Sequence, residues 1–223
     1  MPAQTKTEVI EVPILKLGQL TVELVGDSSL IVHRWSEKAK KEMLDKQMMK
    51  AKGPKEPKDP WGDYISAAYW LDPAQPVAQG KPTSQKSAFA HVTKADVAKA
   101  TFGFPSIAFK SAAVDACTTT GKDIPKTLAR MAFHVLGEFV EIIGHPEMRE
   151  DMVRIGMGTA DLRYRPEFKE WGVKLNVKYN VNVLSVEQII NLINLGGLVG
   201  IGENRPQKDG SHGMYHVKMN KAA

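Results

Sequence analysis

The sequence predicts an α+β protein of ferredoxin-like or modified RRM type, with helices on one face of an antiparallel sheet. Residues 171–180 alternate apolar and polar side chains without a break, which is the period of a strand with one buried face. Residues 185–195 then repeat apolar side chains at the spacing of a helix with one buried stripe. A glycine-rich loop follows, and a last strand is expected at residues 214–218.

The N-terminal half is expected to begin with a strand over residues 8–25, in which Leu20, Val22 and Leu24 share one face. Residues 26–29 end this strand, and an apolar stretch resumes at residue 30. A helix is predicted from Ser36 to about residue 52, where prolines prevent its continuation. The apolar stripe of this helix would be formed by Ala39, Met43 and Leu44. Residues 53–60 and 72–87 are predicted to be exposed loops.

The C-terminal half is expected to contain an alanine-rich helix at residues 107–117, a second helix at 125–134, and an apolar segment at 139–143 that suits a strand. Residues 162–165 and 171–180 are predicted to pair as a β-hairpin that turns at 166–170. Ser185 and Gln188 form the capping box of the last helix. Gly196 and Gly197 are expected to end it.

The whole chain, residues 1–223, is predicted to form a single domain, with a core at about 8–35 and 101–219 and a large lysine-rich insertion at about 36–100. No run of about 20 apolar residues suits a membrane helix. The N-terminus lacks the apolar stretch of a secretory signal, and the lone Cys117 excludes an internal disulfide framework. We therefore expect a cytoplasmic protein without a membrane partner.

The charge distribution predicts a polyanionic partner. The net charge is +5 and the pI is about 9.1, and between residues 34 and 58 basic side chains outnumber acidic ones. Aromatic side chains lie in and beside this segment, and cationic tracks beside aromatic rings hold single strands without reading sequence. The predicted contacts are Arg34, Trp35, Lys38, Lys40, Lys41, Lys46 and Lys50. An equal interpretation is that the lysine-rich segment is an amphipathic helix with a solvated face, and that most of the aromatic rings pack in the core.

The loop at residues 200–213 is a second candidate for contact with nucleic acid. Its glycines would let a polynucleotide backbone approach, and basic side chains lie among them. The predicted contact residues are Gly200, Gly202, Arg205, Lys208 and His212. A flexible connector between the last helix and the last strand is the alternative.

The motifs of common enzymes are not found. The sequence contains no GxSxG or HExxH motif, and the glycines near residue 200 follow a predicted helix and lack the third position of a dinucleotide loop. We expect a non-catalytic protein with no cofactor and no metal. Two alternatives stay open: a metal-dependent ribonuclease that uses Asp27 or the His212/His216 pair, and a docking or inhibitor module that uses the basic helix.

Two segments resemble the RAMP superfamily, which supplies the repeated backbone subunits of CRISPR effector complexes. They are residues 20–34, LTVELVGDSSLIVHR, and the glycine-rich element GIGENRP at 200–206 with DGSHGMYHV at 209–217. The chain also looks similar to small stand-alone relatives in bacterial viruses, for which a role with single-stranded DNA in replication or recombination is equally plausible.

The resemblance implies a homo-oligomer or filament that runs along single-stranded RNA or DNA and touches its phosphates. Other subunits of a ribonucleoprotein complex are further implied partners, and residues 36–100 would correspond to the variable thumb or lid of the family. No clear equivalent of the catalytic aspartate loop of RNA-cutting members is found, and Asp27 is only a weak match.

Overall fold

The protein contains two antiparallel β-sheets. A computed structural model describes residues 13–51, 56–119, 123–155 and 158–219. The larger, seven-stranded sheet has the order β10-β1-β9-β6-β4-β3, and β5 pairs with β9 beside β6. The strands of this sheet are β1 (Leu17–Gly26), β3 (Tyr69–Asp72), β4 (Thr101–Pro105), β5 (Phe133–Val135), β6 (Phe139–Ile143), β9 (Gly172–Asn180) and β10 (Tyr215–Val217). The smaller sheet has the order β2-β8-β7, formed by β2 (Leu30–Ile31), β7 (Pro146–Ile155) and β8 (Thr159–Phe168).

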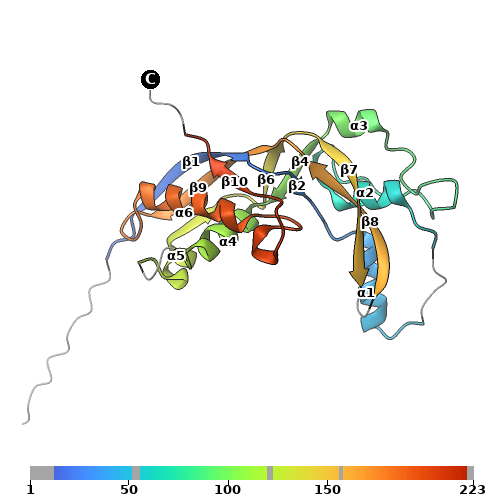
Figure 1. The fold of residues 1–223 in the computed structure, drawn as a ribbon, viewed down its shortest axis with the longest axis horizontal. Helices are drawn as coiled ribbons and strands as arrows, with labels where there is room; N and C mark the ends of the chain where they lie inside the picture. Colours follow the sequence, from blue (N-terminus) through green and yellow to red (C-terminus); the bar gives the residue numbers. More distant parts are fainter. Residues whose placement is uncertain (1–12, 52–55, 120–122, 156–157, 220–223) are drawn as a thin grey trace, which may run out of the picture.

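The helices pack on different parts of the two sheets. Two of them, α4 and α6, pack on each other and, with α5, lie on one side of the larger sheet, while α2 packs on β8 (Figure 1). The bounds are α1 (Glu37–Gln47), α2 (Pro60–Ala67), α3 (Lys94–Lys99), α4 (Ser106–Ala116), α5 (Lys126–Ala132), α6 (Val186–Val199) and the 3-10 turn η1 (Pro206–Lys208). The predicted α+β class with antiparallel pairing is therefore confirmed. No helix in the described part of the chain is long and apolar enough to cross a membrane.

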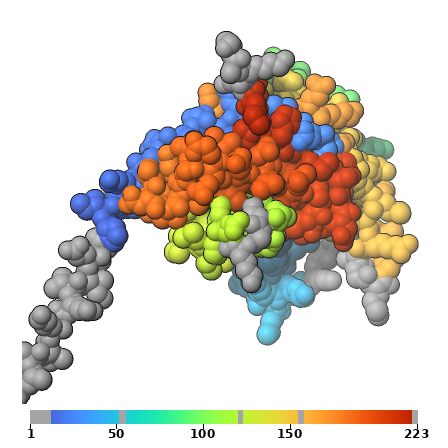
Figure 2. All heavy atoms as spheres, turned by 60° about the vertical axis from the view of Figure 1, so that its left-hand side comes forward, coloured from blue at the N-terminus to red at the C-terminus, as the bar shows by residue number. Residues whose placement is uncertain are grey.

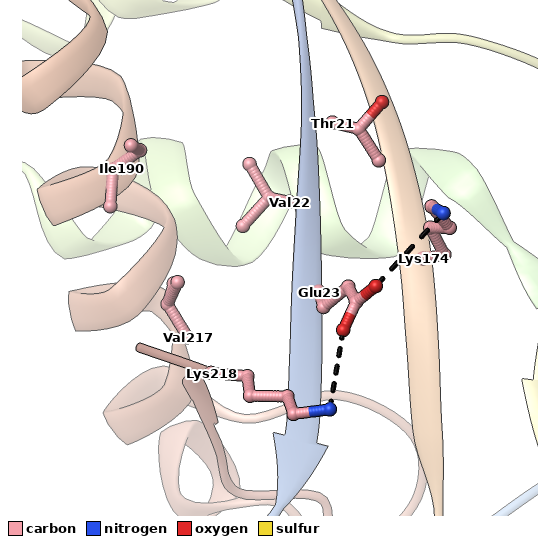
Figure 3. A pocket seen from close by; sticks show the side chains of 7 residues that line it. All are labelled: Thr21, Val22, Glu23, Lys174, Ile190, Val217 and Lys218. Atoms are coloured by element: carbon pink, nitrogen blue, oxygen red, sulfur yellow. Dashed lines mark hydrogen bonds and ion pairs between the residues drawn. The ribbon is translucent and has the colours of Figure 1, made fainter. Parts of the chain in front are cut away.

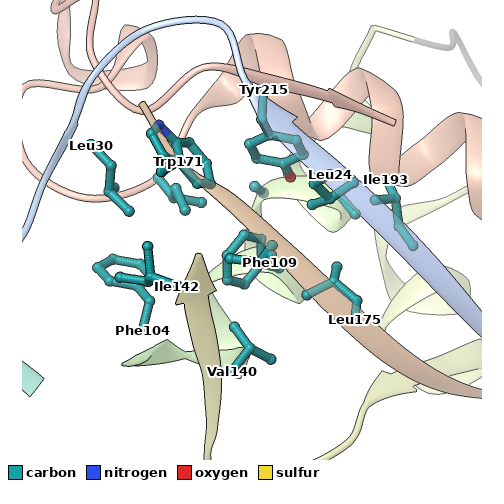
Figure 4. Packing of buried hydrophobic residues seen from close by; sticks show 14 of the residues in the cluster. Leu24, Leu30, Phe104, Phe109, Val140, Ile142, Trp171, Leu175, Ile193 and Tyr215 are labelled. Atoms are coloured by element: carbon teal, nitrogen blue, oxygen red, sulfur yellow. The ribbon is translucent and has the colours of Figure 1, made fainter. Parts of the chain in front are cut away.

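The core forms between the larger sheet and its helices. In β1, Val22 and Leu24 are buried while Thr21 and Glu23 are exposed, so the predicted alternation is confirmed there. The same holds in β9, where Val173, Leu175, Val177 and Tyr179 form the buried face. Phe109 of α4 and Ile193 of α6 complete this layer against Leu24 and Leu175 (Figure 4).

The predicted hairpin between residues 162–165 and 171–180 is wrong. The chain leaves the smaller sheet at Phe168 and enters the larger one at Gly172, so β8 and β9 never pair. The real hairpin is β7–β8, in which Arg149 lies opposite Arg165 and Glu147 opposite Glu167. Alternation shows that a strand has two faces, but it does not name the neighbouring strand.

Several predicted boundaries also move. Helix α1 ends at Gln47 rather than near residue 52, and Pro60 begins α2 instead of closing a loop, because Asp59 caps that helix by accepting from the Gly62 N–H. Helix α5 ends at Ala132, where β5 begins. Residues 8–12 of the predicted first strand lie outside the described part of the chain, and strand structure begins only at Leu17.

Gly196 and Gly197 do not end α6, which continues to Val199. A Cβ atom at Gly197 would lie 1.6 Å from the Tyr215 carbonyl oxygen, and one at Gly196 would lie 2.9 Å from the Ala113 nitrogen. These glycines let α6 approach β10 and α4 closely. The helix ends at Gly200 instead, whose φ of 74° lies in the left-handed region that favours glycine.

Replacing Gly197 by alanine tests this close approach. Alanine favours a helix over glycine by about 1 kcal/mol, so without the contact the change would stabilise the protein. We expect instead a net loss of about 1–3 kcal/mol, because the methyl group meets the Tyr215 backbone. Urea denaturation measures the difference. The neighbouring exposed change Leu198→Ala is the control, expected within about 0.5 kcal/mol of the parent. A stabilised Gly197→Ala protein would contradict the packing.

Candidate nucleic-acid interface

The glycine loop at residues 200–213 packs against β2, which joins the two segments that the sequence singles out. The Glu203 N–H donates to the Ile31 carbonyl at 3.0 Å, and the Gly213 N–H donates to the Ser29 carbonyl at 2.8 Å. Ile201, which is buried, closes the loop by donating from its N–H to the Gly213 carbonyl at 3.0 Å. Residues 33–35 lead from this contact to α1, so the chain itself connects the two groups of predicted residues.

The loop glycines are required by the protein's own packing. Gly202 has a φ of 75°, and a Cβ atom there would lie 2.5 Å from the Ile31 carbonyl oxygen. At Gly200 the added atom would lie 2.6 Å from the Pro206 Cδ. The space in which we expected a polynucleotide backbone to approach these two glycines is thus occupied by the chain itself. Any contact with phosphate from this loop therefore depends on its side chains and not on bare glycine backbone.

The basic side chains of the loop differ in freedom. Arg205 donates from Nη1 to the Gly202 carbonyl at 2.9 Å and from Nε to Gln207 Oε1 at 3.0 Å, so it braces the loop. The side chain of Lys208 is exposed. His212 is half-buried, and its Nδ1 lies 2.9 Å from Ser29 Oγ. Lys208 is therefore the loop cation best placed to meet a ligand.

Glu203 and His33 join the loop to the segment that leads to α1. His33 Nδ1 lies 3.5 Å from Glu203 Oε1. The hydrogen bond from His33, together with the positive charges of Arg165 and Lys208, lowers the pKa of Glu203 to about 2. The carboxylate is consequently ionised at all ordinary pH values and offsets the charge of the buried Arg165 beneath it.

Helix α1 contributes no buried side chain to the core. Ser36 caps it by accepting from the Ala39 N–H at 3.2 Å. The predicted apolar stripe exists but faces solvent, since Met43 is 43% and Leu44 54% exposed. Figure 2 shows the helix (light blue) projecting from the body of the molecule. Its sequence is therefore not explained by core packing.

Trp35 differs from the other aromatic residues of this region. It is 54% exposed at the base of α1. Tyr64 and Trp70 are buried, and Trp61 donates from Nε1 to the Val92 carbonyl at 2.9 Å. The interpretation that most of these rings pack in the core is confirmed, and Trp35 is the exception.

The predicted lysines in α1 and just after it fall into two groups. Lys38 pairs with Glu56, Lys40 with Glu37 and Lys50 with Asp45, at distances of 3.1, 2.9 and 3.0 Å. Arg34 also binds Glu37, at 3.0 Å. Lys41 and Lys46 form no ion pair within the described residues. These two lysines are the least compensated of the predicted cations between residues 34 and 50.

A charged network under the loop escapes sequence reasoning. Ser29 Oγ donates to Glu167 at 2.7 Å, and Arg149 binds both Glu167 and Asp151 at 2.9 and 2.8 Å. Arg165, only 4% exposed, lies 3.5 Å from Asp151. The available signal is the set of charged residues at every second position, 147, 149 and 151 in one arm of the β7–β8 hairpin and 163, 165 and 167 in the other.

The residues of the ribonuclease alternative are held in separate contacts. His216 Nδ1 lies 2.6 Å from Asp27 Oδ1, whereas His212 contacts Ser29. Among the described residues, no group of three or more His, Cys, Asp and Glu side chains is arranged to hold a metal ion.

Comparisons with known proteins assign no family. No family model matches the chain, and no curated protein matches it. Among solved structures, Cmr6 from Pyrococcus furiosus is similar with a TM-score of 0.40 and 10% sequence identity, over 92% of this chain and 100% of that one. A similarity of this size carries no argument about function, and the resemblance to the RAMP superfamily stays a prediction.

The contact between Glu203 and its cationic neighbours predicts a pH-dependent stability. Because the pKa of Glu203 is lowered to about 2 in the folded protein, its contribution is present above the ordinary carboxyl pKa of about 4.3 and is lost as the pH falls toward 2. Glu203→Gln should therefore unfold at lower urea than the parent at pH 7, and the gap should shrink at pH 3.

The matched control for Glu203 is Glu42→Gln, which removes an exposed carboxylate from α1. It is expected to change the free energy of unfolding by less than about 0.5 kcal/mol at both pH values. An equal loss for Glu203→Gln at pH 3 and pH 7 would show that packing, rather than charge, explains its effect.

Proposed function

We propose that the protein binds single-stranded RNA or DNA without reading its sequence, as a non-catalytic subunit that oligomerises along the strand. The observation that carries the proposal is helix α1, which bears Lys38, Lys40, Lys41 and Lys46 and buries nothing. A charged helix that does not stabilise a core is explained most simply by a ligand that binds its surface.

The strand order of the larger sheet supports a ferredoxin-like, RRM-type core. Four of its strands run β10-β1-β9-β6, with α4 between β1 and β6 in sequence and α6 between β9 and β10. This is the arrangement of a split β-α-β unit. In our proposal, the segment with α1, α2, β3 and α3 is an insertion into that core, although Ile65 and Trp70 of this segment share the hydrophobic cluster.

The ion pairs of α1 do not oppose the proposal. They are exposed, and pairs of this kind contribute about 0–1 kcal/mol each. A phosphate that approaches Lys38 or Lys40 therefore displaces a weak partner. The proposed contact surface comprises the predicted basic and aromatic side chains and His212, without Gly200 and Gly202. Lys41, Lys46 and Lys208 are its most available charges, and Arg205 holds the loop in place.

The charge contribution is tested with Lys41→Ala/Lys46→Ala. Fluorescence anisotropy with pyrimidine oligonucleotides across a salt series should show a log–log slope of about −0.7 per phosphate neutralised. The double variant should bind more weakly at low salt, and its slope should be shallower by about 1.4 if each lysine meets one phosphate.

The control for the double lysine change is Lys81→Ala/Lys86→Ala, which removes the same charge from exposed positions between β3 and α3. It should keep the parental slope. If the two double variants bind alike, α1 is not the nucleic-acid surface, and the protein-docking alternative gains support from its exposed Met43 and Leu44. Parallel incubation of labelled RNA with and without chelator tests for cleavage, and chelator-sensitive products would contradict the non-catalytic assignment.

Trp35 is expected to stack on a base. Replacing it by alanine should weaken oligonucleotide binding by about 1–3 kcal/mol while leaving the salt slope unchanged, because stacking releases no counterions. Anisotropy at two salt concentrations measures both quantities. Trp35→Phe retains a ring and is expected to recover most of the affinity, so an equal loss in the two variants would contradict stacking.

A further inference from the structure

One edge of the larger sheet is left open along most of β1. Strand β10 pairs only with Leu24, Val25 and Gly26, and the Glu23 carbonyl accepts from the Lys218 N–H at 2.8 Å. From residue 17 to residue 22, β1 has β9 on one side and no strand on the other among the described residues. An open strand edge in a sheet is a template for a further strand.

A hollow marks the point where β10 ends and the open edge begins. It has a volume of about 300 Å³. Val22 and Ile190 point into it from β1 and α6, and Val217 lies beside them (Figure 3). Glu23 lies across it between Lys174 and Lys218, at 3.9 and 3.4 Å. The hollow thus offers apolar contact on the helix side of the sheet and charged side chains on the other.

The chain itself carries apolar side chains that lack cover just before this edge. Ile14 is 83%, Leu15 62% and Leu17 51% exposed. The segment is not free to move away from the sheet, because the Lys16 carbonyl accepts from the Val181 N–H at 3.0 Å and the Ile14 carbonyl accepts from Asn182 Nδ2 at 3.0 Å. Residues 14–17 therefore prolong the line of β1 and present unburied apolar surface.

The direction of the backbone groups limits how a strand can add. Because Lys16 faces β9 and Glu23 faces β10, the N–H and C=O groups of Leu17, Gln19 and Thr21 face the open edge. A second β1 related by a two-fold axis must set these odd-numbered residues opposite each other. Centred on Gly18, it pairs Leu17 with Gln19 and Leu15 with Thr21, and it stops before Glu23, whose carbonyl is already used.

We propose that two copies of this chain pair edge to edge through residues 14–22 of β1, antiparallel and centred on Gly18. In this register Ile14 of each copy lies opposite Val22 of the other, at the apolar side of the hollow. The contact covers the exposed apolar side chains and satisfies the open backbone groups together. The inference adds detail to the oligomerisation in the proposed function and rests on the proposed function in that respect alone. The interface itself needs no nucleic acid.

The backbone pairing is tested with Gln19→Pro against Gln19→Ala, by sedimentation velocity of the full chain without nucleic acid. Proline removes the N–H that faces the open edge and leaves the bonds to β9 intact. The parent and Gln19→Ala should be dimers with similar dissociation constants. Gln19→Pro should dissociate about tenfold more readily or more, with an unchanged circular dichroism spectrum.

The side-chain contact is tested independently with Ile14→Lys against Met131→Lys. Met131 on α5 is 72% exposed, so both variants exchange an exposed apolar side chain for a charge. Only Ile14→Lys should raise the dissociation constant of the dimer, again by about tenfold or more.

A parent protein that is monomeric at every concentration, or Gln19→Pro and Ile14→Lys proteins that dimerise like their controls, would overturn the inference. Oligonucleotide anisotropy on the same samples separates the two proposals. A dimer that depends on Gln19 and Ile14 but binds no oligonucleotide leaves the interface standing and removes the proposed function.

Discussion

The structure depends on one crossing point near Trp171, where the chain passes between the two sheets. Three connections pass between the sheets here: β1 to β2, β6 to β7, and β8 to β9. The buried Trp171 ring donates from Nε1 to the Ser28 carbonyl at 2.8 Å. The backbone carbonyl of Trp171 accepts from the Gly26 N–H at 2.9 Å. Only glycine fits over the ring, since a Cβ atom at Gly26 would lie 2.2 Å from the indole nitrogen. At Gly144 the added atom would lie 2.4 Å from the Glu170 carbonyl oxygen.

The position of the candidate interface depends on this crossing. The glycine loop is attached to the same segment, because the Asp27 N–H donates to the Met214 carbonyl at 2.8 Å and the Met214 N–H donates to Ser28 Oγ at 3.0 Å. Residues 26–34 therefore run from the crossing past the loop to the base of α1.

Sequence reasoning succeeds where the information is local. The alternation in β9, the capping box at Ser185 and the start of α1 at Ser36 each depend on neighbouring residues, and each is present. It fails where the partner is distant. The residues of β8 were predicted to be one arm of a hairpin with β9, but they pair with β7, and Glu167 and Arg165 of β8 form ion pairs with Arg149 and Asp151 of β7. Gly196 and Gly197 read as a helix end because the sequence does not show that Tyr215 lies against them. Both halves of the candidate interface were predicted, but their contact through Ile31 and Glu203 was not, because it joins segments at opposite ends of the chain.

Helix α1 is short for a helix without tertiary support. Isolated helices of fewer than about 12–15 residues are marginal in water, and α1 has 11. Its described support consists of the Ser36 cap, the Glu37–Lys40 pair, the ion pair between Lys38 and Glu56, and the hydrogen bond from the Arg34 N–H to the Ala67 carbonyl at 2.8 Å. The helix therefore depends on its cap and a few ion pairs and on no buried side chain of its own.

The two proposed surfaces lie toward opposite ends of the molecule. Figure 1 places the start of β1 at one end of the long axis and α1 toward the other. A dimer formed through β1 would therefore leave both α1 helices at its periphery, where each can meet a strand without competing with the interface. A two-fold contact uses the same patch on both copies and closes on itself, so it cannot by itself extend into a filament. Continuous coating of a strand would then need a second contact between dimers, and the strand itself can supply it, since neighbouring α1 helices that bind adjacent phosphates are linked through the bound polymer.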